Sequence, residues 1–260
     1  MKEMLHASTE TPRWLRFPGA RMMRRALRAV LGPAILLAIS GDALGQDLWS
    51  APLGTRISRS ATLAGRIAPL PPGEFELVSR AIDRSPIEKG GVWLMSTAAG
   101  KYDASVWFFT NRERASLWNM NDLCRIPAFF SFVEGQGGRP DFECWKVSAR
   151  TFDQKASGAF LEFVKRSTAA GSPNVAPFVY MQIVSRREIL EVEYDFAPSR
   201  WGLSDDPRVW SQNAWNPANV RKDPARARAL QVLADQGKPL SDALKAGLAG
   251  RPSEFIWKLQ

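Results

Sequence analysis

The clearest pattern in this chain lies between residues 178 and 196. In the run Ile189–Phe196, apolar residues alternate with acidic ones from Leu190 onward, which is the period of a strand with one face in the core and one in water. The run Phe178–Ser185 before it is rich in β-branched and aromatic residues. Ser185 and Glu188 also fit a helix capping box, but the strict alternation favours a hairpin turning at Arg186–Arg187.

Three further stretches have strand character. Phe75–Ile82 mixes apolar and polar residues, and Val92–Thr97 and Ala104–Thr110 are β-rich runs. The short link Ala98–Asp103 contains a glycine, so the two β-rich runs predict a second hairpin. Another strand is expected at Cys144–Arg150.

Helical patterns appear later in the chain. Ala156–Ala170 places its phenylalanines on one face and is followed by a glycine. Asp223 can cap a helix that has Pro224 at its first position and ends at Gly237. A further short helix is expected from Pro239. Strands grouped before helices predict an α+β fold with a largely antiparallel sheet, C-terminal helices and one disulfide.

The first 45 residues have the pattern of a secretory signal peptide. Four arginines between positions 21 and 28 precede the apolar run Ala29–Ile39, and Ala43-Leu44-Gly45 supplies the small residues of a cleavage site. The run is shorter than the roughly 20 apolar residues that a membrane span needs. Translation starting at Met22 or Met23 would leave a leader of ordinary length. The mature chain is therefore predicted to be periplasmic or secreted, with no transmembrane segment.

The rest of the chain is predicted to have two parts. Residues 46–73 contain four prolines and no sustained period, which is typical of an extended arm. Residues 74–260 are long enough for a single α+β domain.

Cys124 and Cys144 are the two cysteines of the chain. In an oxidising compartment a lone pair indicates one disulfide, which would stabilise the fold by about 3 kcal/mol on the chain-entropy model. Two buried thiols or a redox pair are the alternatives, but a redox pair usually has Cys-x-x-Cys spacing. A structural disulfide is the preferred interpretation.

Charge and composition exclude several classes of function. The full chain carries +9, and +5 once the +4 of residues 1–45 is removed, with the charges interspersed. No basic stripe or known module indicates a nucleic-acid partner. The single histidine, His6, lies in the predicted leader, so histidine-based hydrolases and the usual zinc and copper sites are excluded. No cofactor and no metal site are predicted.

Carboxylate chemistry is the enzymatic possibility that remains, because glycoside cleavage needs only two acidic residues. The candidates near predicted loops are Asp122, Asp141, Glu143, Asp205 and Asp206. Acidic residues in loops more often cap or face solvent, so none is assigned a catalytic role.

The segment from Pro198 to Pro217 is the predicted ligand-binding surface. It combines Trp201, Trp210 and Trp215 with Arg208 in proline-bounded, irregular sequence. Indole rings beside guanidinium groups can stack on sugars or aromatic groups and hold an anion. The competing interpretation is that these indoles are core, as large aromatics usually are.

Three functions are compatible with these features. The leading hypothesis is a non-enzymatic exported protein of the bacterial envelope, acting as a binding or accessory module on an envelope partner or ligand whose identity the sequence does not give. The main alternative is a carboxylate-only hydrolase of cell-wall or extracellular glycans. The third is an inhibitor or effector that presents the loop between the cysteines to another protein.

Overall fold

The computed structural model describes residues 47–83, 89–111, 129–135, 142–152, 158–171, 174–185, 188–251 and 255–259. All of them belong to one compact unit, Gly45–Gln260. The predicted signal peptide and Cys124 lie outside the described residues.

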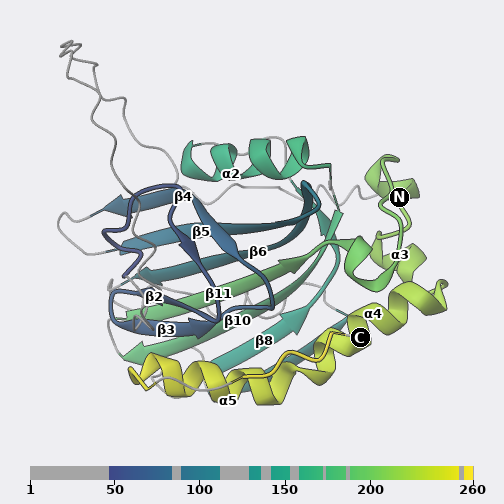
Figure 1. Cartoon of the computed structure of the whole chain (residues 1–260). Coiled ribbons are helices and arrows are strands. Elements are labelled where there is room, and N and C mark those ends of the chain that lie inside the picture. Colours follow the sequence, from purple (N-terminus) through teal and green to yellow (C-terminus); the bar gives the residue numbers. More distant parts are fainter. Residues whose placement is uncertain are drawn as a thin grey trace, which may run out of the picture. The chain divides into compact units, whose positions relative to one another are not determined.

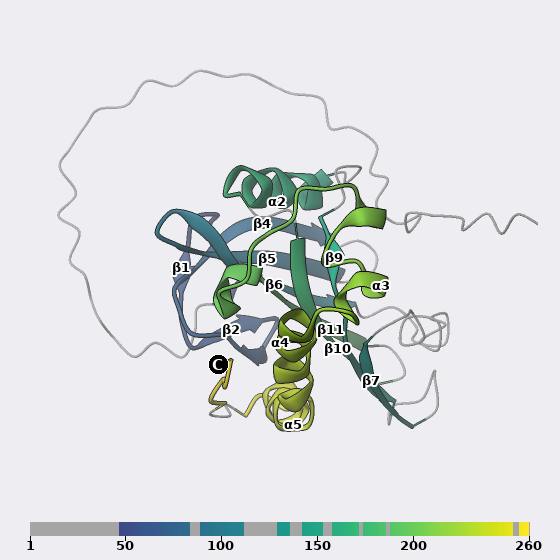
Figure 2. The same cartoon turned by 90° about the vertical axis from the view of Figure 1, so that its right-hand side faces the viewer.

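An antiparallel sheet of nine strands forms the centre of this unit (Figures 1 and 2). The strands run in the order β1-β4-β5-β6-β11-β10-β8-β7, and β9 pairs with β10 off this path. Their bounds are β1 Arg56–Ile57, β4 Phe75–Asp83, β5 Lys89–Ala98, β6 Lys101–Asn111, β7 Phe130–Glu134, β8 Glu143–Val147, β9 Arg150–Thr151, β10 Asn174–Ser185 and β11 Glu188–Phe196. A separate hairpin joins β2 (Ser60–Leu63) and β3 (Arg66–Pro69). Together with the helices, these strands confirm the predicted α+β fold.

Both predicted hairpins are present. β5 and β6 pair up to Ala98 and Lys101, and the intervening Ala99 and Gly100 have φ angles of 51° and 76°. Two successive positive φ angles are the signature of the tight turn whose twist matches antiparallel strands. β10 and β11 pair from Ala176–Phe196 to Ser185–Glu188, on either side of the predicted turn.

One face of the sheet is covered by the C-terminal helices and the β2–β3 hairpin (Figure 1). The helices are α3 (Pro217–Val220), α4 (Pro224–Asp235) and α5 (Gly237–Leu248). Their leucines pack on fully buried aromatic residues of the sheet, among them Phe178 and Tyr194. Trp257 near the C-terminus packs edge-on against Tyr194 and Phe196, with ring centroids 5.0 and 5.5 Å away. This face holds the largest apolar core.

The other face carries α2 (Gly158–Ala169), close to the predicted helix Ala156–Ala170. Phe163 and Val164 of α2 are buried against Trp93 and Val78 of the sheet. Ser79 of β4 donates a hydrogen bond of 2.6 Å to the carbonyl of Ala159, which fixes the start of the helix on this strand.

The helix predicted from Asp223 is confirmed, but its end differs. The Asp223 carboxylate accepts hydrogen bonds from the backbone of Ala225 and Arg226, as an N-cap should. α4 ends at Asp235 with Gln236 as its C-cap, and Gly237 begins α5 instead of closing α4. A Cβ at Gly237 would lie 2.3 Å from the ring of Trp145, so glycine is needed there for close packing.

The extended arm predicted for residues 46–73 is wrong. Leu48 and Leu63 are fully buried, Leu70 is nearly so, and all three belong to the main core. The Asp47 carboxylate closes this region by accepting hydrogen bonds from the backbone of Trp49 and Ala64, at 2.9 and 3.0 Å. The strands here have two to four residues, too few to show a period in a proline-rich sequence.

Cys144 lies on β8 and is 4% exposed. It is not a free thiol. Its predicted partner, Cys124, is not among the described residues, so the pairing of these two cysteines stays a prediction.

Candidate functional site

Of the three tryptophans predicted to bind a ligand, one is in the core and two are partly buried against it. Trp215 is fully buried, and its indole N–H points to the carbonyl of Ser204 at 3.4 Å. Trp201, at the end of the 3-10 helix η3 (Pro198–Trp201), packs edge-on against Phe196 at 6.1 Å. Trp210, in η4 (Trp210–Gln212), is half-buried against the same core. For Trp215 the core interpretation is therefore correct, and the three indoles form no shared open surface.

The side chain of Arg208 forms an ion pair with Asp206. Its side chain is 59% exposed, and it holds the Asp206 carboxylate through Nε at 2.9 Å and through a terminal nitrogen at 2.7 Å. Asp206 also accepts the backbone N–H of Ala214. The hydrogen bond from Arg208 is the largest of the interactions that hold the pKa of Asp206 below its ordinary value. This network orders the irregular segment.

The other carboxylate candidates that the structure describes have structural partners. Glu143 is 2% exposed and forms an ion pair with Lys245 of α5. Asp205 accepts a hydrogen bond from the side chain of Asn174. Asp122 and Asp141 lie outside the described residues.

A buried charged cluster on β11 was not predicted. The alternation had placed Glu191, Glu193 and Asp195 on a face in water, yet Glu193 is 7% and Asp195 2% exposed. Arg150 of β9 forms ion pairs with both, and its nitrogen lies 3.0 Å from Asp195 Oδ1. We call Arg150, Glu193 and Asp195 the β11 cluster. The sequence period gave the correct faces of the strand, but it could not show that the polar face is covered.

Polar side chains of β6 extend the β11 cluster. Ser105 donates a hydrogen bond of 3.1 Å to Asp195 and lies 2.7 Å from the hydroxyl of Tyr102. Burial raises the pKa of Asp195 to about 7, against the opposing effect of Arg150. Burial, and then the negative charge of Glu193, raise the pKa of Glu191 to about 8. Shifts of this size are found both at functional sites and in structural ion-pair networks, so they do not identify a function by themselves.

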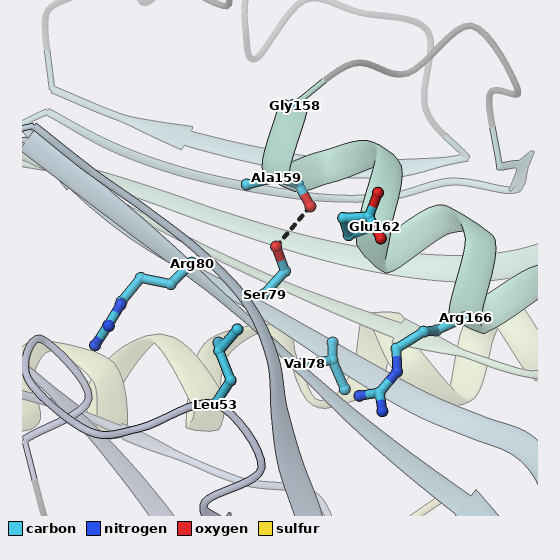
Figure 3. A pocket seen from close by; sticks show the side chains of 8 residues that line it. All are labelled: Leu53, Val78, Ser79, Arg80, Gly158, Ala159, Glu162 and Arg166. Atoms are coloured by element: carbon cyan, nitrogen blue, oxygen red, sulfur yellow. Dashed lines mark hydrogen bonds between the residues drawn. The ribbon is translucent and has the colours of Figure 1, made fainter. Parts of the chain in front are cut away.

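An open groove lies between β4 and α2 (Figure 3). Its volume is about 480 Å³, within the range of about 300–1,000 Å³ common for ligand sites. Eight residues line it: Leu53, Val78, Ser79, Arg80, Gly158, Ala159, Glu162 and Arg166. We call this the β4–α2 groove.

The chemistry of the β4–α2 groove is mixed. Leu53 is 60% exposed at its edge, and Val78 adds a second apolar side chain. Arg166 forms an ion pair of 2.8 Å with Glu76, and Glu162 one of 3.0 Å with Lys165. Arg80 donates to the carbonyls of Trp49 and Ala51, at 3.3 and 2.7 Å. An apolar patch rimmed by charge is suited to binding.

The groove contains one carboxylate, that of Glu162, and neither Glu193 nor Asp195 of the β11 cluster lines it. A glycoside hydrolase needs two carboxyl groups on either side of the bond it cleaves. Sequence reasoning missed the groove because its residues come from a loop, a strand and a helix, none with an unusual local pattern.

A scan against protein-family models, a search of curated proteins and a search of solved structures each found no match. Among the described residues, no cluster of three or more acidic, histidine or cysteine side chains is placed to hold a metal ion. The helices in the same part of the chain are all too short or too polar to cross a membrane.

Proposed function

We propose that the protein is exported to the periplasm or secreted, and acts in the bacterial envelope as a non-enzymatic binding or accessory module. The pattern of residues 1–45 supports the compartment. The single observation that carries the binding role is the open β4–α2 groove, which has an exposed apolar side chain at its edge and one carboxylate among its lining residues.

The hydrolase alternative has less support. Glu193 and Asp195 are close enough to share one guanidinium group, but both are paired with Arg150 and both carboxylates are buried. A buried, paired carboxylate is poorly placed to attack a glycan or to activate water for it.

The proposed fold includes a disulfide between Cys124 and Cys144. That Cys144 of β8 is not a free thiol supports it, and a bond there would tie the loop between the cysteines to the sheet. The bond is also the expected state of a lone cysteine pair in an exported protein.

The binding role is tested by capture from envelope extract with two matched variants. Leu53→Asp places a charge at the edge of the groove, whereas Ile256→Asp changes a 77% exposed apolar residue that does not line it. Both substitutions are at exposed positions and should leave the thermal midpoint nearly unchanged.

The expected result is a captured molecule that the unaltered protein and Ile256→Asp retain and that Leu53→Asp loses by about tenfold. Equal capture by all three proteins, or no specific capture, would contradict the role of the groove. Release of reducing sugars from envelope glycans would instead support the hydrolase.

A further inference from the structure

The groove lies where strand pairing along β4 stops. β4 has nine residues, but β1 pairs only with Phe75 and Glu76. Two more hydrogen bonds extend this contact by one residue, from Leu77 N–H to Thr55 and from Gly54 N–H to Leu77, at 2.8 and 2.9 Å. Among the described residues, the chain before Gly54 makes no backbone hydrogen bond to β4, and Leu53 lines the groove.

The register of β4 on β5 shows which backbone groups face outward beyond that point. Leu77 directs its N–H and C=O away from β5, towards the segment before β1. Val78 is the extra residue of a bulge, since Leu77 pairs with Leu94 and Ser79 with Trp93. Alternation along the strand then directs the N–H and C=O of Arg80 and Ile82 outward.

Within the described part of the chain, the outward N–H and C=O groups of Arg80 and Ile82 form no backbone hydrogen bond. Unpaired N–H and C=O groups along a strand edge are a template for a further strand. Natural proteins use such edges to bind extended peptides, with backbone hydrogen bonds for affinity and flanking pockets for specificity.

A surface lies on each side of the β4 edge and could contact the side chains of an added strand. Side chains of an added strand would alternate between the side of Leu53 and Arg80 and the side of α2, where Ala159 and Glu162 lie (Figure 3). No aromatic ring lines the groove, so the stacking surface that sugars favour is missing from it.

The charges around the groove favour an acidic partner. Arg166 and Glu162 are each matched by an opposite charge. Among the described residues, Arg80 donates only to neutral carbonyls and has no carboxylate partner. The positive charge of Arg80 is therefore not balanced by a carboxylate in this part of the chain.

We infer that the β4–α2 groove binds an extended polypeptide segment as an added strand on the edge of β4, with a carboxylate of the segment near Arg80. This inference rests on the proposed binding function and names the class of ligand. Hydrogen bonds from the segment to Arg80 and Ile82 hold it in register, and its apolar side chains contact Leu53 and Val78.

The test uses a display library of random octapeptides selected on the purified protein expressed from the full chain. Selected peptides are then synthesised with one N-methyl group at each backbone position in turn. An added strand uses the N–H of every second residue, so N-methylation should reduce affinity by about tenfold or more at alternate positions and much less between them. Selected sequences should also share an Asp or Glu at a fixed position.

Two variants at one position test the edge itself. Ile82→Pro removes the outward N–H, whereas Ile82→Ala keeps it, so only the proline variant should lose the peptides. Because Ile82→Pro can also disturb the strand, the N-methyl series on the unaltered protein remains the deciding measurement.

Affinity losses without the two-residue period, or no selected peptide, would overturn the added-strand inference. If Leu53→Asp still lost the envelope molecule in that case, the groove would remain the binding site for another class of ligand. If Leu53→Asp had no effect either, the proposed function would fail as well.

Discussion

Arg150 holds two buried carboxylates of one strand with a single guanidinium group. Its nitrogen lies 3.0 and 3.1 Å from the two oxygens of Asp195 and also pairs with Glu193. Burying charges is costly unless they are paired and hydrogen-bonded. Arg150 offsets only part of that cost, because the pKa of Asp195 is still raised to about 7. Glu191, next to the β11 cluster, keeps a proton at neutral pH because of burial and the charge of Glu193.

Glu191 should make stability depend on pH. Its pKa in the folded protein is raised from 4.5 to about 8. Between these values the folded state binds more protons than the unfolded state, so the free energy of unfolding should fall as the pH rises through this window. Glu191→Gln lacks the titrating carboxyl group, so its free energy of unfolding should fall less steeply across the same range.

The measurement is urea unfolding at several pH values. Glu74→Gln, at a side chain that is 61% exposed, is the control and should follow the unaltered protein. Parallel curves for Glu191→Gln and the unaltered protein would show that Glu191 is ionised in the fold.

The secondary-structure elements that can be predicted from the sequence are those with a long alternating pattern or a strong helix N-cap. The β10–β11 hairpin has seven alternating residues on one strand, from Leu190 to Phe196, and α4 has Asp223 and Pro224 at its start. The β2–β3 hairpin has neither, so its sequence predicts an extended arm. It is held instead by long-range contact, with Gly247 of α5 against the backbone of Ile67.

Gly247→Ala should therefore destabilise the protein. A Cβ at this position would lie 2.0 Å from the carbonyl oxygen of Ile67, and a backbone atom cannot move aside cheaply. Alanine alone would favour the helix by about 1 kcal/mol, so helix propensity predicts the opposite sign. We expect a net loss of about 1–3 kcal/mol, the usual range for overpacking, in urea unfolding.

Lys238→Ala is the control on the same helix, since it removes only an exposed ion pair with Asp242. It should change the unfolding free energy by less than about 1 kcal/mol. A Gly247→Ala protein as stable as the original would mean that α5 does not approach β3 so closely.

Across the folded chain, the sequence was informative about fold class and poor about the site. The antiparallel sheet and the C-terminal helices follow from local patterns. The β4–α2 groove does not, because it depends on where β1 stops along β4 and on where α2 crosses the strand. Trp215 is the opposite case: its irregular sequence context predicts a binding residue, but the side chain is buried in the core.

The disulfide concerns the stability of the whole unit. Protein recovered from an oxidising compartment should show no free thiol when denatured without reductant. Reduction should lower the unfolding free energy by about 3 kcal/mol, which is a large part of typical stability. Two titratable thiols in such material would contradict the bond between Cys124 and Cys144.

The most direct test of the proposed binding role is photo-cross-linking in intact bacteria that export the protein. A photoreactive amino acid is introduced in place of Leu53, at the edge of the groove, and in a second strain in place of Ile256, which is exposed away from it. We expect a discrete adduct from position 53 after illumination and none of that mass from position 256. The same adducts from both positions, or no adduct from position 53, would contradict the proposal that the β4–α2 groove is the binding site.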